Sequence, residues 1–470
     1  MDGLTVVIDV GKTLSKASLW TSAAELVARE TRPNERVYAD GYVALDADGI
    51  DAWLGDVLAG FARTGRIARI VPVGHGAAAV LVADGRALLP PIDYEERLAD
   101  REGYDRARSP FAETGSPALP DGLNLGAQLH HLERLRPALR ERSPTILLWP
   151  QYWAWRLSGV AAAEVTSLGC HTDLWNPLGG GPSTLARRRG WAGMLPPVRR
   201  AADVLGRVTG EWALRSGLPA ETEVLCGIHD SNAALLAARG FEEIADHEAT
   251  VLSTGTWFVA MRSPAEGTGL DPAVLPEARD CLVNVDAYGR AVPSSRFMGG
   301  REIELLTGLD TRRVDIKPDQ PALVAAAADV LAGGSRVLPT FAPGFGPFPD
   351  ERGRWVAMPV DQAERRAAVC LYAALVANEA LDLIGARDRI LVEGRFAEAE
   401  VFVRALAALR PRDAVFRSHA HNDVSFGALR LVDPALRPSA ALERVEPLPG
   451  DMARYAAAWR RDVDVGTLAA

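Results

Sequence analysis

The chain has 470 residues, of which 48% are hydrophobic and 24% charged, and this composition excludes a largely disordered protein. Its net charge of −9 and the lack of a long apolar run argue against a nucleic-acid-binding protein and an integral membrane protein. At ~100–200 residues per domain, the length predicts two or three domains.

The N-terminal residues predict a β-hairpin. An apolar run from Leu4 to Asp9 leads into the turn Gly11-Lys12-Thr13, and a second extended run covers 14–20. The start lacks the basic residues and long apolar stretch of a signal peptide, so we expect a cytoplasmic protein. The pattern that follows predicts, in order, a helix over 48–64 and strands over 67–73 and 79–82.

The hairpin turn is a candidate phosphate site. It is not a P-loop, because that motif needs a glycine five positions before Gly11, where Val6 stands. An acid at a strand end, Asp9, followed by a tight glycine turn and the hydroxyl of Thr13, could instead bind phosphate oxygens and a hydrated Mg²⁺. A plain hairpin turn is the alternative.

The middle of the first half contains a long polar excursion and a tryptophan-rich stretch. Residues 90–120 are polar and rich in proline, which predicts a segment running over the surface or over a site. Helical spacing returns over 125–139. Four tryptophans follow, and we expect core packing from them, with stacking against a sugar as the alternative: Trp149, Trp153, Trp155 and Trp175.

A strand, a turn and an Ala/Leu-rich helix are predicted over 223–238, with Asp230 at the strand-to-helix corner. One use of such an acid is to cap the helix that follows. The other is general base catalysis, in which Asp230 accepts the proton of a hydroxyl that attacks a phosphate.

The second half of the chain opens as the first does. Residues 250–261 again predict strand, glycine turn and strand, with Ser253-Thr254-Gly255-Thr256 at the turn. This repeated pattern predicts two related domains, 1–240 and 241–470. A helix over 361–384, a strand over 389–392 and a helix ending at Leu409 complete an α/β alternation with mixed sheets.

The four cysteines (Cys170, Cys226, Cys281 and Cys370) show no metal-ligand spacing, so we expect free thiols in a reducing compartment.

Taken together, three motifs resemble those of the FGGY family of carbohydrate kinases, over most of the chain. Asp9-Val-Gly-Lys-Thr-Leu-Ser-Lys16 is similar to the family's first phosphate motif, His229-Asp230 to the pair that contains its catalytic base, and Val251 to Trp257 to its second phosphate motif. The residues of the last two motifs are most similar to those of L-fuculose and L-rhamnulose kinases.

The resemblance implies two actin-like (ribonuclease H-like) domains with mixed sheets flanked by helices and an active site in the cleft between them. It implies transfer of the γ-phosphate of ATP to O1 of a small ketose, with Mg²⁺ near Asp9 and Asp230 as the base. Implied nucleotide contacts are Gly11, Lys12, Thr13, Lys16, Thr254, Gly255, Thr256, Gly299, Gly394 and Arg395. Implied sugar contacts are Gly74, His75, Gly76, Tyr94, Glu95, His229 and Asp230.

The sequence departs from the family pattern at two places. His75 stands where an acid is usual, and either a sugar contact or a solvent-facing turn histidine would explain it. Glu393 and Glu398 replace a glycine and an asparagine of the adenine loop. L-Fuculose is the favoured substrate, with L-rhamnulose, ribulose or xylulose as alternatives, and a catalytically silent sugar sensor is a rival function. No nucleic-acid or membrane partner is expected, and a homodimer is left open.

Overall fold

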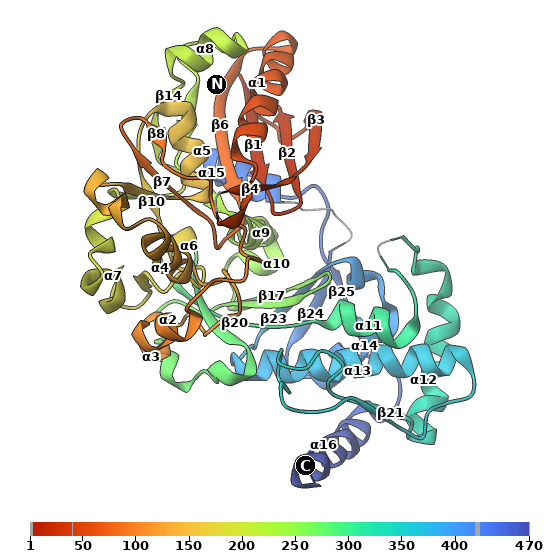
Figure 1. The fold of residues 1–470 in the computed structure, drawn as a ribbon. Coiled ribbons are helices and arrows are strands. Elements are labelled where there is room, and N and C mark those ends of the chain that lie inside the picture. Colours follow the sequence, from red (N-terminus) through yellow and green to blue (C-terminus); the bar gives the residue numbers. More distant parts are fainter. Residues whose placement is uncertain (1–2, 40, 312, 419–423, 470) are drawn as a thin grey trace. The chain divides into compact units, whose positions relative to one another are not determined.

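The computed structural model describes residues 3–39, 41–311, 313–418 and 424–469 (Figure 1). The chain divides into two compact units. Unit 1 comprises Met1–Gly240, Val283–Ala291 and Asn422–Arg437, and unit 2 comprises Phe241–Leu282, Val292–His421 and Pro438–Ala470. The predicted 241–470 domain is therefore interrupted twice by segments that belong to unit 1.

Unit 1 begins with a β-hairpin and is otherwise an alternation of strands and helices. Its strands are β1 (Leu4–Val10), β2 (Leu14–Trp20), β3 (Leu26–Pro33), β4 (Arg36–Ala39), β5 (Tyr42–Leu45), β6 (Ile67–Gly74), β7 (Ala79–Ala83), β8 (Arg86–Ala87), β9 (Thr145–Leu148), β10 (Ala163–Glu164), β11 (Trp175–Asn176), β12 (Gly181–Pro182), β13 (Val198–Arg199), β14 (Val204–Arg207), β15 (Glu223–Leu225) and β16 (Ile228–His229). Its helices are α1 (Ala47–Thr64), α2 (Arg101–Ala107), α3 (Phe111–Thr114), α4 (Leu125–Leu135), η1 (Pro137–Arg142), α5 (Trp149–Ser158), α6 (Val165–Leu168), α7 (Thr184–Arg188), η2 (Trp191–Met194), α8 (Gly210–Ser216), α9 (Asp230–Ala238) and α15 (Val424–Val432).

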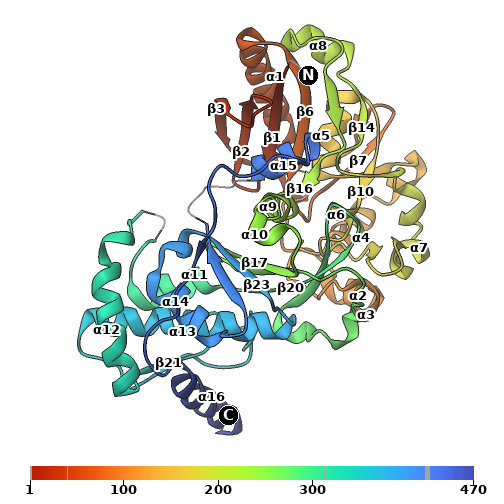
Figure 2. The same ribbon diagram turned by 180° about the vertical axis from the view of Figure 1, so that it is seen from behind.

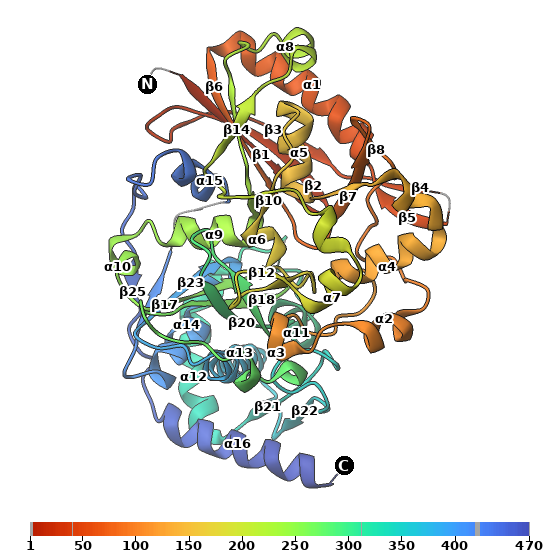
Figure 3. The ribbon, with the colours of Figure 1, turned by 90° about the vertical axis from the view of Figure 1, so that its left-hand side faces the viewer.

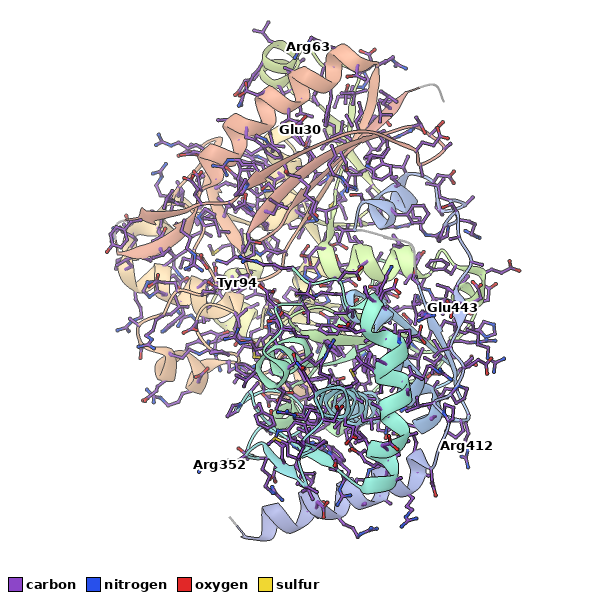
Figure 4. All side chains as sticks on the ribbon, turned by 90° about the vertical axis from the view of Figure 1, so that its right-hand side faces the viewer. Glu30, Arg63, Tyr94, Arg352, Arg412 and Glu443 are labelled. Carbon is purple, nitrogen blue, oxygen red and sulfur yellow. The ribbon has the colours of Figure 1, made fainter. Side chains whose placement is uncertain are left out.

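The main sheet of unit 1 has the strand order β14-β15-β6-β1-β2-β3, and β16 also pairs with β6. Strands β1 and β2 are antiparallel, whereas β6 runs parallel to β1. Because side chains alternate along a strand, Val6 and Ile8 of β1 pack on one face, against α1, α5 and α8, and Val7 packs on the other, against α9 and α15 (Figures 2 and 3). Arg63 lies in the last turn of α1, and Glu30 lies on β3 at the sheet edge (Figure 4).

A second layer of unit 1 is built on the small sheet β8-β7-β9 and the helices α2, α4, α6 and α7. It contains the segment predicted as a polar excursion, and the structure gives that segment two short helices and a buried anchor, Tyr104. The helix predicted over 125–139 ends at Leu135, because Pro137 lacks a backbone N–H and starts a 3₁₀ turn instead. Trp149, Trp153 and Trp175 are buried, as core packing predicts.

Unit 2 is formed by the second half of the chain. Its strands are β17 (Ala249–Thr254), β18 (Phe258–Ser263), β19 (Cys281–Val285), β20 (Ala291–Phe297), β21 (Arg336–Leu338), β22 (Arg354–Val356), β23 (Arg389–Gly394), β24 (Ala414–Arg417) and β25 (Glu443–Arg444), with β19 and β20 crossing its boundary. Its helices are α10 (Glu242–Ala245), η3 (Pro272–Val274), η4 (Glu277–Arg279), α11 (Gly299–Thr307), η5 (Lys317–Asp319), α12 (Gln320–Gly333), α13 (Gln362–Leu383), η6 (Arg395–Glu398), α14 (Glu400–Leu409) and α16 (Met452–Ala469).

The two units repeat one sheet topology. The order β20-β18-β17-β23-β24-β25 of unit 2 matches β3-β2-β1-β6-β15-β14 of unit 1. In both, the first two strands form an antiparallel hairpin and the next central strand runs parallel to the first. The repeat detected in the sequence is thus a repeat of architecture, and the two glycine turns occupy the same place in each sheet.

The four cysteines are free thiols. No helix among the described residues is both long and apolar enough to span a bilayer.

Candidate active site

The turn between β1 and β2 is held by its own backbone and by one asparagine. The N–H of Gly11 donates to the carbonyl of Leu14 at 3.1 Å, and Asn34 donates its Nδ2 to the carbonyl of Gly11 at 2.7 Å. A Cβ on Gly11 would lie 2.8 Å from the oxygen of Leu14, so the turn needs glycine there. Thr13 is exposed, and its N–H and hydroxyl have no partner among the described residues, which leaves both available for a phosphate.

The two lysines of this hairpin bind different carboxylates. Lys16 lies opposite Asp9 in the β1–β2 register and its Nζ is 3.0 Å from Asp9 Oδ2. Lys12 forms an ion pair with Asp93, lies 4.0 Å from Glu95, and has its Nζ 4.8 Å from the ring centre of Tyr94. Burial lowers the pKa of Lys12, against the effect of Asp93. The predicted contact of Lys12 with phosphate would therefore compete with Asp93.

Tyr94, which is labelled in Figure 4, and Glu95 lie in the segment between β8 and α2. Arg36 pairs with both Asp93, at 2.8 Å, and Glu95. Burial raises the pKa of Tyr94 to about 12, so its hydroxyl stays protonated. Glu95 is half-exposed and serves the same charge cluster as Lys12.

His75 is buried at the end of β6, which rules out the alternative of a solvent-facing turn histidine. Its Nδ1 is 2.6 Å from the carbonyl of Gly76, so Nδ1 carries the proton and donates, and Nε2 is left as an acceptor. That Nε2 is buried without a partner among the described residues. Burial lowers the pKa of His75 to about 4, which keeps the ring neutral.

Aromatic rings and glycines surround His75. Its ring lies edge-on to Tyr94 at 5.5 Å and tilted to Trp149 at 6.0 Å. A Cβ on Gly74 would lie 2.9 Å from Trp149, and one on Gly76 would lie 2.6 Å from the sulfur of Cys170. Both glycines are therefore required for close packing around this ring.

Asp230 is the first residue of α9 and follows His229, the last residue of β16. The N-cap residue of this helix is His229 and not Asp230, but the Asp230 carboxylate accepts from an N–H of the first helical turn, so the capping alternative stays open. The Oδ1 of Asp230 is 2.6 Å from the N–H of Ser231, 3.2 Å from the Ser231 hydroxyl and 3.2 Å from Nε2 of His229. Its Oδ2 has no partner among the described residues. Burial raises the pKa of Asp230, and the hydrogen bonds from Ser231 and the charge of Lys16 act against this.

The turn between β17 and β18 is tied to the neighbouring strand β23. The hydroxyl of Thr254 donates to the carbonyl of Glu393 at 2.6 Å and accepts from the N–H of Phe396 at 3.0 Å. Its single proton is thus used inside the protein, contrary to the prediction that this hydroxyl binds phosphate. The N–H of Gly255 closes the turn on the carbonyl of Trp257 at 3.0 Å. Thr256 is exposed and its N–H and hydroxyl are unpartnered among the described residues.

The N-terminus of α11 packs on this turn. A Cβ on Gly300 would lie 1.9 Å from the carbonyl oxygen of Gly255, whereas one on Gly299 would meet Phe297 and Phe258 of the core. Arg301 donates its N–H to the carbonyl of Thr256 at 3.4 Å. Of the two glycines it is Gly300, not the predicted Gly299, that touches the turn, and the sequence signal was only that two glycines precede a helix.

The end of β23 brings an acid beside the turn. Ser253 donates its hydroxyl to Glu393 Oε1 at 2.5 Å, and burial raises the pKa of Glu393 to about 7. Gly394 has φ +85° and a Cβ there would lie 2.3 Å from the oxygen of Thr254, so only glycine fits. Arg395 lies 3.6 Å from Glu304 of α11. Behind these residues lies a mostly apolar pocket, whose lining includes Ile303, Thr307, Leu309, Phe396 and Phe402.

These observations define a class of enzyme. Each of two units with one sheet topology carries a glycine turn whose threonine donors have no partner among the described residues. Unit 1 adds an aspartate at a strand-to-helix junction, with one carboxylate oxygen that likewise has no partner in the described part of the chain. Such parts are those of a phosphoryl-transfer enzyme with a duplicated α/β fold, because that chemistry needs positioned donors for phosphate and a base for the attacking hydroxyl.

Comparisons with known proteins agree with this class. A family model described as "Carbohydrate kinase FGGY, C-terminal domain" matches residues 246–440. A carbohydrate kinase from Novosphingobium aromaticivorans is 56% identical, with 99% of each chain covered and a TM-score of 0.95. The chain belongs to the FGGY family of carbohydrate kinases and is a kinase with two actin-like domains.

More distant structures share the fold alone. A xylulose kinase from Rhodospirillum rubrum is 21% identical, with 98% of each chain covered and a TM-score of 0.79. A glycerol kinase with ADP from Plasmodium falciparum is 13% identical, with 99% of this chain and 98% of that chain covered and a TM-score of 0.78. Among curated proteins, no sequence matches this chain.

Proposed function

We propose that this kinase transfers the γ-phosphoryl group of ATP to a hydroxyl of a small ketose, with Asp230 as the general base. The observation that carries the proposal is the asymmetry of the Asp230 carboxylate, since three contacts from His229 and Ser231 hold Oδ1 and leave Oδ2 to accept a proton. The sugar oxygen attacks the γ-phosphorus, the bond from that phosphorus to the bridging oxygen of ADP breaks, and the hydroxyl proton passes to Oδ2.

ATP binding is assigned to both glycine turns. Thr13 in unit 1 and Thr256 in unit 2 each offer an unpartnered N–H and hydroxyl, and their glycines allow a phosphate to approach the backbone. The adenine base is assigned to the region of Gly394 and Arg395, next to Phe396 at the start of η6. Lys16 would add positive charge where it develops on the phosphates.

Asp9 is the residue assigned to Mg²⁺. Its carboxylate is buried at the end of β1 with Lys16 as a cationic partner, and an oxygen donor set of one carboxylate suits a cation that keeps most of its water. When bound, Mg²⁺ would neutralise charge between the β- and γ-phosphates. The protein's own part is to hold Asp9 in place through the strand and its lysine.

The sugar site is assigned to the residues around His75. Its Nε2 is a buried acceptor that has no partner in the described part of the chain, and a sugar hydroxyl would donate to it. The ring of Tyr94 beside His75 supplies an apolar surface that suits the C6 methyl group of a 6-deoxyketohexose, and the residues around His229 and Trp257 resemble those of L-fuculose kinases. L-Fuculose is therefore proposed ahead of L-rhamnulose, ribulose and xylulose, with O1 as the acceptor.

The test is kcat/KM for L-fuculose, L-rhamnulose, ribulose, xylulose and glycerol under one set of conditions. A methyl contact discriminates by only ~1–3 kcal/mol, so we expect L-fuculose first and the pentuloses at reduced kcat/KM. Glycerol or an aldose in first place would overturn the substrate assignment while leaving the phosphoryl transfer. ATP turnover that no sugar stimulates would favour the rival function, a sugar sensor.

The base is tested by Asp230→Asn. The amide keeps the size and most hydrogen bonds but cannot take a proton, so kcat should fall at least about 10²-fold with the KM for ATP little changed. Asp105→Asn, at an exposed pair with Arg101, is the matched control and should keep wild-type kcat. Wild-type kcat in Asp230→Asn would show that another group is the base.

A further inference from the structure

We propose that Asn232 holds the imidazole of His229 in its Nε2–H tautomer and so makes His229 a donor to Asp230. Asn232 is in this sense a positioning residue. The inference rests on the proposed role of Asp230 as the base.

Three side chains contact the buried ring of His229. The Nδ2 of Asn232 lies 3.2 Å from its Nδ1. On the other side of the ring, Nε2 lies 3.2 Å from Oδ1 of Asp230 and 3.3 Å from the sulfur of Cys170. All four residues belong to unit 1, and His229 and Asn232 are 5% and 1% exposed.

The protonation of His229 follows from these contacts. Burial lowers the pKa of His229 to about 4, so near neutral pH the ring carries one proton. A neutral imidazole has one donor nitrogen and one acceptor nitrogen. With the proton on Nε2, the ring donates to the Asp230 carboxylate and accepts from the Asn232 amide. With the proton on Nδ1, the lone pair of Nε2 would face the carboxylate and the Asn232 amide would have to turn over.

Packing alone does not explain an asparagine at this position. The Oδ1 of Asn232 is buried and has no partner among the described residues, which costs free energy that an apolar side chain of the same size would not lose. The feature that only asparagine supplies is the Nδ2 donor, and that donor is used on His229.

The tautomer of His229 affects the proposed base, Asp230. A donor at His229 adds to the Ser231 contacts on Oδ1 of Asp230, so the carboxylate is held by one oxygen and presents the other. Besides Asp230, the titratable groups near this ring are Cys170 and His75, and both are buried.

The tautomer is measured directly by ¹⁵N NMR of the full-length protein labelled at histidine, with His229 assigned from the His229→Gln variant. The wild type should show a protonated Nε2 and an unprotonated Nδ1. Asn232→Asp places a carboxylate against Nδ1 and should move the proton there, whereas Asn232→Leu removes the donor without replacing it. A protonated Nδ1 in the wild type would overturn the inference even if neither variant folds.

Kinetics supply the second measurement. We expect kcat at least about tenfold lower in Asn232→Asp and intermediate in Asn232→Leu, with both KM values within about threefold of wild type. Asn378→Asp in α13 is the matched control, a buried helical asparagine far along the chain in unit 2 that should keep wild-type kcat. Unchanged kcat in Asn232→Asp would also overturn the inference. Wild-type kcat in Asp230→Asn would refute the base and leave the NMR result to decide the tautomer.

Discussion

At position 75 this chain has a histidine where the family motif usually has an acidic residue, and this is its clearest departure from the motif. A neutral ring replaces a charge beside Asp230, and its geometry leaves one acceptor, Nε2, instead of the two oxygens of a carboxylate. The site is therefore expected to take a single hydrogen bond from the sugar at this point. The buried, unpaired nitrogen makes that bond worth measuring.

Replacing His75 with Phe tests this contact. The ring and its packing against Tyr94 and Trp149 are kept, but a sugar hydroxyl loses its acceptor, and an unpaired buried polar group costs ~1–3 kcal/mol. We expect kcat/KM for the best sugar to fall about 10–100-fold with the KM for ATP unchanged. Steady-state kinetics with each substrate varied would check this, and an unaltered KM for sugar would remove His75 from the site.

Sequence motifs predict which residues form the site, but they do not predict the hydrogen bonds that each group makes. Thr254 and Thr256 are indistinguishable in a Ser-Thr-Gly-Thr pattern, yet the first is buried with its proton donated to Glu393 and the second is exposed. Strand β23, which comes more than a hundred residues later in the chain, decides which of the two hydroxyls forms a hydrogen bond within the protein. A short sequence motif contains no information about contacts between residues so far apart in the chain.

At the scale of elements, α11 and the β17–β18 turn depend on one glycine. The carbonyl of Gly255 occupies the place that a Cβ on Gly300 would take. Helix α11 can approach the turn only because that side chain is missing.

Gly300→Ala should therefore move α11 away from the turn and weaken nucleotide binding. We expect the KM for ATP to rise at least about tenfold, with a smaller change in the KM for sugar. Gly333→Ala, in the last turn of α12 where nothing lies within 4 Å, is the matched control and should be close to wild type. Equal ATP affinity in the two variants would show that the turn does not need this contact.

The short helix α6 is capped at its N-terminus by a buried acid, Glu164. Glu164 accepts from the N–H of Thr166 and Ser167, and from the Thr166 hydroxyl at 2.5 Å. That same hydroxyl accepts from the backbone N–H of His229 at 3.0 Å, so the cap of α6 also positions the strand before Asp230. Burial raises the pKa of Glu164 to about 7.

The raised pKa of Glu164 makes the protein less stable as the pH rises. An acid whose pKa is about 7 in the folded protein and ~4.3 when unfolded loses its proton first in the unfolded chain, so stability falls as pH rises through this range. Relative to Glu164→Gln, the wild type should lose up to about 3 kcal/mol of unfolding free energy between pH 4.5 and 7. Urea unfolding of both proteins at several pH values would measure it, and parallel profiles would contradict a raised pKa.

The order of the main elements was predictable from hydrophobic pattern. The hairpins at Gly11 and Gly255, the long helix α13 and strand β23 were all expected within a few residues, because each has a strong local period or a glycine turn. Residues 90–120 were not, since a proline-rich polar stretch has no period. Its helices α2 and α3 are anchored by tertiary contacts such as that of Tyr104 with Asp173.

At the scale of the whole molecule, the two units are interleaved in the chain. Unit 1 needs α15, whose Ala428 and Leu429 join Val7, Val71 and Ala233 in one core on a face of its sheet. The sequence before residue 240 contains no pattern that predicts this contribution, because the helix that completes the core comes almost two hundred residues later. The two-domain prediction captured the repeat and missed the two later segments that belong to unit 1.

A fragment of residues 1–240 should therefore be insoluble or loosely packed. Without α15 it exposes the apolar face formed by β1, β6 and α9, and it also lacks residues 283–291. Joining residues 424–437 to it through a flexible linker should raise its soluble yield and lower its binding of a hydrophobic dye. Cooperative unfolding of the 1–240 fragment alone, without dye binding, would contradict this expectation.

The late position of α15 also bears on the synthesis of the protein. A ribosome that has made all of the first sheet still has to translate nearly the whole of unit 2 before the helix that covers that sheet emerges. At ~5–20 residues per second this leaves an open apolar face for ~10–40 seconds. The nascent chain would need a chaperone or transient self-association during that interval, so codon changes that slow translation between 240 and 437 should lower the yield of folded enzyme without altering any residue.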